Sequence, residues 1–230
     1  MGTVLKPDTR EIIRFLNLVA APEQIVELRL LKVQRCGQRF PCTLSGYFND
    51  HNKLAAQAAK LSAVAQGAYI TLNPVNTDLL ARSANRVRLA GRDFPLTTDA
   101  DVTARRWLPI DLDPVRPRGV SSTEEEHEFA LERARQIRDA LRAEGWPRPI
   151  LADSGNGAHL LYKIDLHSDD GEVVKKCLEA LALRFDDDRI KVDRTVFNPA
   201  RIWKLYGTLS RKGDSLPDRP HRLARILEAP

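Results

Sequence analysis

Residues 107–145 read WLPIDLDPVRPRGVSSTEEEHEFALERARQIRDALRAEG. Their beginning predicts a strand over 107–113, because two acids alternate with apolar residues and the prolines that follow favour an end there. A run of serine and threonine then leads into three glutamates at 124–126, which is typical of a capped helix start with acids where the helix dipole favours them. Small and apolar residues recur at helical spacing from Ala130 to Leu141. The stretch therefore predicts one strand followed by one long helix that ends near residue 144.

The rest of the second half predicts three further strands and a second helix. Two strands are expected at 149–152 and 158–164, on either side of the turn sequence SGNG. A second helix is expected over 171–185 and a short strand over 190–193. The order β-α-β-β-α-β is typical of a ferredoxin-like or RRM-like fold. A further strand is expected over 201–206.

The first half predicts a smaller α/β unit. Strands are expected at 23–33 and 43–48, with Cys36-Gly37 in the turn between them, and at 68–72. A helix is expected over 51–65, capped by Asn49-Asp50. Residues 75–104 are polar and irregular, and this pattern predicts a boundary between two subdomains. The expectation is thus an α+β protein with an N-terminal α/β subdomain at 1–104 and an RRM-like subdomain at 105–230.

The composition is that of an ordinary globular protein, with 43% hydrophobic and 29% charged residues in a chain of 230. The net charge of +5 suits a polyanionic partner such as nucleic acid. The alternative is that the arginine-rich composition reflects codon usage, since many basic proteins bind nothing anionic. No stretch approaches the roughly 18 consecutive apolar residues of a membrane helix. The first residues show no secretory signal, and three cysteines cannot all pair. A cytoplasmic protein without membrane contact is expected.

The sharpest chemical feature is the pair Asp111 and Asp113. Alternate residues of a strand share a face, so the two carboxylates point the same way, on alpha carbons about 6.6 Å apart. Two like charges at that spacing repel unless a cation neutralises them, and hard oxygen ligands suit Mg²⁺ or Mn²⁺. The alternative is a pair of solvated acids at the end of a strand.

A second feature is the turn at 154–159, which reads SGNGAH. Two glycines allow a close backbone approach to a phosphate, a serine offers its hydroxyl, and a histidine opens the next strand where it can donate to a phosphate oxygen. The alternative is an ordinary hairpin turn, because the same residues are common turn formers. The candidate phosphate ligands are Ser154, Gly155, Asn156, Gly157 and His159.

Two further features follow in the chain. Asp193 ends the apolar run IKVD, which places a carboxylate at a sheet edge, and NPARIWKLYGT at 198–208 sets Arg201 and Lys204 among aromatic and aliphatic residues. Cations beside aromatics suit a nucleotide or a nucleic-acid backbone. The alternative is a packed strand whose Arg and Lys reach solvent along its surface. Residues 165–193 hold nine acids against five bases, and 195–230 hold seven bases against three acids, the charge division that a site for metal and phosphate needs.

In combination these features resemble the archaeo-eukaryotic primase (AEP) superfamily, in its bacterial and phage primase-polymerase branch. That family carries a DxD motif, an SxxGxH-like motif and a hydrophobic-Asp motif in this order, which here read DLD at 111–113, SGNGAH at 154–159 and VD at 192–193. The segment 198–208 resembles the basic stretch that follows the third motif. The match spans residues 105–215, and 46–48 and 69–88 resemble the N-terminal half of the same domain less specifically.

The resemblance implies a DNA primase or DNA polymerase that uses two Mg²⁺ or Mn²⁺ ions. Asp111, Asp113 and Asp193 would hold the ions, and the 154–159 turn with Arg201 and Lys204 would hold the phosphates of an NTP or dNTP. The implied partners are single-stranded or primer-template DNA and a helicase or helical module, either fused or in trans. Two other classes fit the residues alone: a metal-dependent nuclease and a non-catalytic RRM-like nucleic-acid-binding module.

Overall fold

The computed structural model describes residues 5–34 and 40–230. The predicted turn at Cys36-Gly37 lies outside the described residues. No helix within the described part of the chain is long and apolar enough to cross a membrane. Its α-helices are α1 (Thr9–Val19), α2 (His51–Ser62), α3 (Glu124–Ala143) and α4 (Val173–Phe185).

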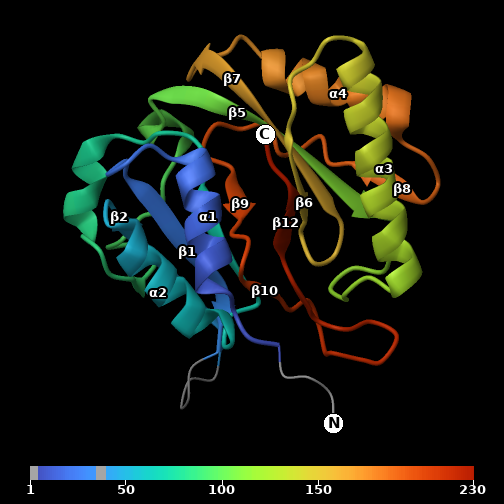
Figure 1. The fold of residues 1–230 in the computed structure, drawn as a ribbon. Helices are drawn as coiled ribbons and strands as arrows, with labels where there is room; N and C mark the ends of the chain where they lie inside the picture. The colour runs from blue at the N-terminus through green and yellow to red at the C-terminus, as the bar shows by residue number, and fades with distance from the viewer. Residues whose placement is uncertain (1–4, 35–39) are drawn as a thin grey trace.

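The first sheet is built mainly from the N-terminal half of the chain. Its strand order is β4-β2-β1-β3-β9, and every neighbouring pair is antiparallel. Figure 1 shows α1 and α2 side by side along this sheet. The strands are β1 (Val26–Val33), β2 (Cys42–Phe48), β3 (Gly67–Thr71), β4 (Arg88–Leu89) and β9 (Ile202–Lys204).

The second sheet has the strand order β12-β6-β7-β5-β8, again antiparallel throughout. Four of its strands and the helices α3 and α4 follow each other as β5-α3-β6-β7-α4-β8, so the predicted α+β, RRM-like order is confirmed. In Figure 1 the two helices lie on the opposite side of the molecule from α1 and α2. The strands are β5 (Ala104–Pro114), β6 (Ile150–Asp153), β7 (Ala158–His167), β8 (Ile190–Val192) and β12 (Arg225–Glu228).

Local sequence signals account for the helix starts. Thr123 caps α3 through a capping box in which its hydroxyl accepts from the amide of Glu126 and the Glu126 carboxylate accepts from the amide of Thr123. The Asp50 carboxylate accepts from the amides of Asn52 and Lys53 at the start of α2. Each cap satisfies backbone donors that the first helical turn leaves unpaired.

Three features of the fold were not predicted. Helix α1 begins after the capping residue Asp8, in a segment for which no helix is predicted. The short strands β10 (Leu209–Ser210) and β11 (Arg222–Leu223) pair with each other, and β12 joins the edge of the second sheet beside β6. The predicted polar segment 75–104 contains two short 3₁₀ helices, at Thr77–Arg82 and Asp99–Asp101, in addition to β4.

The end of the chain completes both sheets. Strand β9 pairs with β3, with Lys204 opposite Tyr69, whereas β12 pairs with β6. The subdomain boundary predicted between residues 104 and 105 stays a prediction. After residue 105 the chain returns once to the first sheet, through β9. One continuous cluster of buried side chains spans both sheets. The Trp107 indole also donates to the carbonyl of Val19 at 3.2 Å and ties β5 to α1.

Helix α1 should contribute strongly to stability, since Leu16 is fully buried within the shared core. We expect Leu16→Ala to lower the free energy of unfolding by about 2–5 kcal/mol, through lost burial and the cavity left behind. Leu183 on α4 is 90% exposed, so the same change there should cost about 0.5 kcal/mol or less. Urea denaturation of both variants measures the difference. Equal losses in the free energy of unfolding would contradict the contribution of α1 to stability.

Candidate active site

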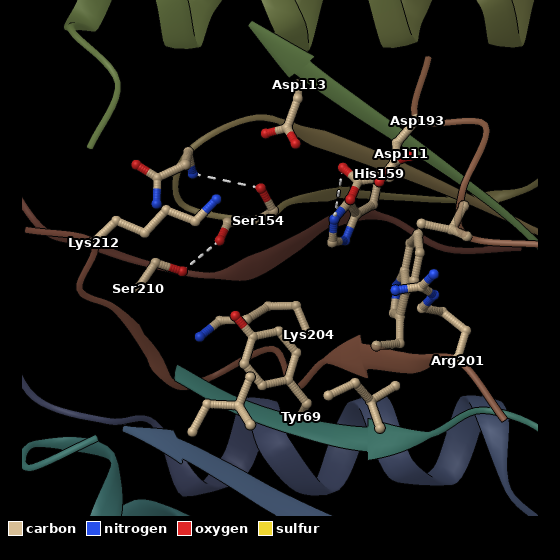
Figure 2. Close-up of a pocket in the computed structure, with 15 residues that line it drawn as sticks. Tyr69, Asp111, Asp113, Ser154, His159, Asp193, Arg201, Lys204, Ser210 and Lys212 are labelled. Carbon is tan, nitrogen blue, oxygen red and sulfur yellow. Dashed lines mark hydrogen bonds and ion pairs between the residues drawn. The ribbon is translucent and has the colours of Figure 1, made fainter. Parts of the chain in front are cut away.

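A cavity of about 240 Å³ lies where the two sheets face each other, and it collects most of the predicted site residues. Figure 2 shows the three aspartates on one side, and Arg201, Lys204 and Lys212 around the other. All predicted site residues except Gly155 and Gly157 line it. The lining residues are Leu31, Tyr69, Asp111, Asp113, Ser154, Asn156, His159, Asp193, Val196, Arg201, Ile202, Trp203, Lys204, Ser210 and Lys212.

The acidic wall of this cavity comes from β5 and the residue after β8. Asp111 and Asp113 both face the cavity, while Ile110 and Leu112 between and beside them are fully buried, as the alternation of a strand requires. The amide of Asp193 donates to the carbonyl of Asp111 at 2.8 Å. Three carboxylates from two adjacent strands therefore line one cavity.

The two β5 carboxylates have opposite pKa shifts. Burial and the neighbouring Asp111 charge raise the pKa of Asp113, against Lys212 and Arg116, which lower it. Burial disfavours the charged form of Asp111, but His159 and nearby cations outweigh it and hold the pKa of Asp111 below its usual value. The Asp113 carboxylate is also 3.2 Å from both terminal nitrogens of Arg116. The pair thus behaves as two like charges that need positive neighbours.

The chemistry of this wall fits a hard divalent cation. Asp111 and Asp113 offer oxygen ligands on one face, and their mutual repulsion is what a bound cation relieves. Asp193 lines the same cavity, although its carboxylate accepts from the amide of Thr195 at 2.8 Å. Within the described residues, no three His, Cys, Asp or Glu side chains are gathered closely enough to hold a metal ion as they stand. Asp193 would have to turn from Thr195 to join the other two.

His159 stands directly opposite Asp111 in the β5–β7 ladder. Its Nε2 atom lies 3.3 Å from an Asp111 carboxylate oxygen, as the dashed line in Figure 2 marks, and its Nδ1 atom lies 3.0 Å from the Tyr206 hydroxyl. The ring is buried and packs against Trp203, with centroids 4.1 Å apart. Each ring nitrogen of His159, the predicted phosphate ligand, therefore has a protein neighbour.

The SGNG turn is held by its own hydrogen bonds. The amide of Gly155 donates to the Asp153 carboxylate at 2.6 Å, and the amide of Gly157 donates to the Ser154 hydroxyl at 3.0 Å. Gly155 has φ +89°, and a Cβ at Gly157 would lie 2.2 Å from the carbonyl oxygen of Leu112. The glycines are needed here for a left-handed turn and for packing against β5. Their predicted contact with phosphate stays a prediction, and Ser154 is the part of the turn that lines the cavity together with Asn156.

The basic wall comes from residues 201–212. Arg201 donates to the carbonyl of Thr195, while its buried Nε has no hydrogen-bond partner. Lys204 is 4% exposed, and its ammonium group donates to the carbonyl of Leu209 at 2.6 Å. Burial, with a smaller effect from Lys212, lowers the pKa of Lys204 to about 7. These are incompletely compensated cations, which an anionic ligand would stabilise.

Several lining residues were missed by the sequence analysis. Lys212 belongs to the basic wall and affects the pKa of Asp111, Asp113 and Lys204. Tyr69 stands opposite Lys204 in the first sheet, with its ring 5.5 Å from the Lys204 nitrogen. The excess of bases at 195–230 was a signal for Lys212, but no local pattern indicated that Tyr69 from the first sheet would face the aspartates.

Comparisons with known proteins support the fold. No protein-family model matches the chain, and no curated protein matches it. A solved structure, the AEP domain of the primase-polymerase (PrimPol) from cyanophage S-2L, matches 98% of this chain and 92% of its own, with a TM-score of 0.50 and 16% sequence identity. The chain therefore has an AEP-like fold, at the level of overall architecture.

The opposite pKa shifts predict opposite effects of neutralising the two aspartates in metal-free protein. The raised pKa of Asp113 means that stability falls as the pH rises from its ordinary pKa to the raised one, so at pH 7 Asp113→Asn should raise the melting temperature. The lowered pKa of Asp111 means that its ionised form stabilises the fold above the ordinary pKa, so Asp111→Asn should lower it. Thermal melts in chelator measure both, and shifts of the same sign would contradict the charge assignment.

Proposed function

We propose that this protein is a nucleotidyltransferase that extends a nucleic-acid strand along a DNA template, as a primase-polymerase. The observation that supports it best is the division of one cavity into an acidic wall, from Asp111, Asp113 and Asp193, and a basic wall, from Arg201, Lys204 and Lys212. A triphosphate between the two walls would meet cations on one side and metal ligands on the other. The AEP-like fold also supports the proposal, because the solved structure that the chain matches is a primase-polymerase domain.

The basic wall would bind and orient the phosphates of the incoming NTP or dNTP. Arg201 offers a buried N–H that no protein group accepts, and Lys204 and Lys212 offer ammonium groups that line the cavity. The Ser154 hydroxyl and the His159 Nε2 atom reach the cavity from the opposite sheet. Such fixed donors act on the charge that develops on the leaving phosphates, in a site that is already shaped for it.

The acidic wall would hold two divalent cations, with Asp111, Asp113 and Asp193 as the ligands. Two Mg²⁺ or Mn²⁺ ions, when bound, supply the charge that supports an in-line displacement between an attacking 3′-hydroxyl and a triphosphate. The carboxylates contribute by placing negative charge on one strand face, where β5 and β8 fix it. The protein's share of catalysis is then mostly positioning and electrostatics.

Single-stranded or primer-template DNA is the proposed partner. The segment around the edge strand β4 exposes three arginines, Arg86, Arg88 and Arg92. They contribute to the net charge of +5. Such a surface suits a phosphate backbone. A helicase or helical module, fused or in trans, is proposed from the resemblance alone.

An extension assay tests the proposal. We expect labelled product on a single-stranded template, primed or unprimed, with Mn²⁺ or Mg²⁺ and with NTPs and dNTPs supplied separately. The double variant Asp111→Ala, Asp113→Ala should lose synthesis, because the cation ligands on β5 are gone. Circular dichroism and a melt of the same preparation control for folding.

The outcomes also separate the two alternative functions. Shortened DNA in place of extended DNA would identify a metal-dependent nuclease, and a mobility shift without any new product would identify a binding module. Normal extension by the folded double variant would overturn the assignment of the aspartates.

Lys204 predicts a pH dependence of nucleotide binding. Its pKa of about 7 means that Lys204 loses its charge as the pH rises through neutrality. We therefore expect triphosphate affinity to fall between about pH 6 and 8, with proton uptake on binding, and to fall less in Lys204→Met. The exposed Lys163 on β7 provides a control, since Lys163→Met should retain the wild-type profile. Calorimetry in two buffers of different ionisation enthalpy measures both affinity and protons.

A further inference from the structure

Three buried side chains form a series of polar contacts that leads to Asp111 in the acidic wall of the cavity. The Trp203 indole nitrogen is 2.9 Å from the Tyr206 hydroxyl, the same hydroxyl is 3.0 Å from His159 Nδ1, and His159 Nε2 is 3.3 Å from an Asp111 oxygen. Trp203, Tyr206 and His159 are each at most 4% exposed. Water therefore has little access to these groups, and the protein must satisfy each of them.

The direction of every proton in this series follows from its members. An indole N–H can only donate, so the Tyr206 oxygen accepts from Trp203. The Tyr206 hydroxyl proton then needs an acceptor, and His159 Nδ1 is the hydrogen-bonded neighbour that can accept it. The ring proton of His159 is consequently on Nε2, the nitrogen that lies 3.3 Å from an Asp111 carboxylate oxygen.

The other two states of the ring leave a group unsatisfied. With the proton on Nδ1, the Nε2 lone pair would face an ionised carboxylate, and the Tyr206 hydroxyl would lose its acceptor. With both nitrogens protonated, Nδ1 would also donate to Tyr206, so the buried hydroxyl proton would again have no acceptor. A buried donor without an acceptor is costly.

We propose that Tyr206, oriented by Trp203, is a positioning residue that holds His159 as the neutral tautomer with its proton on Nε2. His159 thereby presents one N–H to the cavity, shared between the Asp111 carboxylate and an incoming phosphate. The consequence for catalysis rests on the proposed function, whereas the tautomer itself does not. Tyr206 belongs to neither wall, so this role is additional to the predicted site.

The surroundings keep this series in place. Phe15 of α1 packs on the Tyr206 ring with centroids 4.3 Å apart, and Trp203 packs on the His159 ring. Gly207, at φ +87°, lets the chain turn directly after Tyr206, where a Cβ would lie 2.5 Å from the carbonyl oxygen of Asp8. Helix α1 thus packs on Tyr206, which in turn contacts His159 on the second sheet.

Nitrogen NMR of the metal-free wild-type protein tests the tautomer directly. With ¹⁵N-labelled histidine at pH 7.5, we expect His159 Nδ1 to show the shift of an unprotonated ring nitrogen and Nε2 that of a protonated one. The signal is assigned by its loss in His159→Gln. A proton on Nδ1, or on both nitrogens, would overturn the proposal whether or not the protein is a polymerase.

Tyr206→Phe tests the positioning role, because it removes only the hydroxyl. Without the hydroxyl nothing obliges Nδ1 to accept a hydrogen bond, so we expect a fraction of His159 to become protonated on Nδ1. Mn²⁺ affinity and primer extension should each fall about 10- to 100-fold, the range for changes in residues that support metal ligands. Tyr162→Phe is the matched control, since the Tyr162 hydroxyl is buried without a hydrogen-bond partner. It should change neither tautomer nor affinity.

The remaining outcomes are also decisive. An unchanged His159 tautomer in folded Tyr206→Phe would overturn the positioning role, as would an equal loss of Mn²⁺ affinity in Tyr162→Phe. If Tyr206→Phe fails to fold, Trp203→Phe replaces it, with a smaller shift of the same tautomer expected and an unchanged tautomer counting against the role. The expected tautomer in a wild-type protein that extends no primer would leave this inference standing and overturn the proposed function.

Discussion

Two like charges on one face of a single strand impose the main constraint on this molecule. Asp111 and Asp113 follow each other at the period of a strand, so neither can turn away from the cavity without breaking β5. Their opposite pKa shifts show that the protein compensates them unequally, with His159 next to one and Arg116 next to the other. Much of the surrounding structure supplies positive or hydrogen-bonding groups to this pair.

The return of the chain to the first sheet provides that supply. Strand β9 pairs with β3, which brings Lys204 and Trp203 beneath the aspartates, and the segment after β9 brings Lys212 to the same cavity. The first sheet therefore carries part of the basic wall of a site whose acidic wall lies on the second sheet. One shared core joins the two sheets and so connects the element that carries the acidic wall with the element that carries the basic wall.

In the glycine turn and at His159, the hydrogen-bond partners come from residues outside the local sequence pattern. The turn lies beside the cavity and contributes Ser154, but its Gly155 and Gly157 amides are bonded inside the protein. A sequence pattern reports which residue types are present, whereas the acceptor of each amide depends on neighbours such as Asp153. For His159, Tyr206 forty-seven positions away in the chain is the decisive neighbour.

The sequence by itself determined the features that depend on local backbone geometry. These are the β-α-β-β-α-β order, the capping box at Thr123 and the shared face of Asp111 and Asp113, since strand and helix periods act over a few residues. Only the tertiary structure decided that β9 joins the first sheet and that Tyr69, Tyr206 and Lys212 surround the aspartates. Pairing between strands distant in the chain depends on which surfaces can be buried together, and no local period encodes that choice.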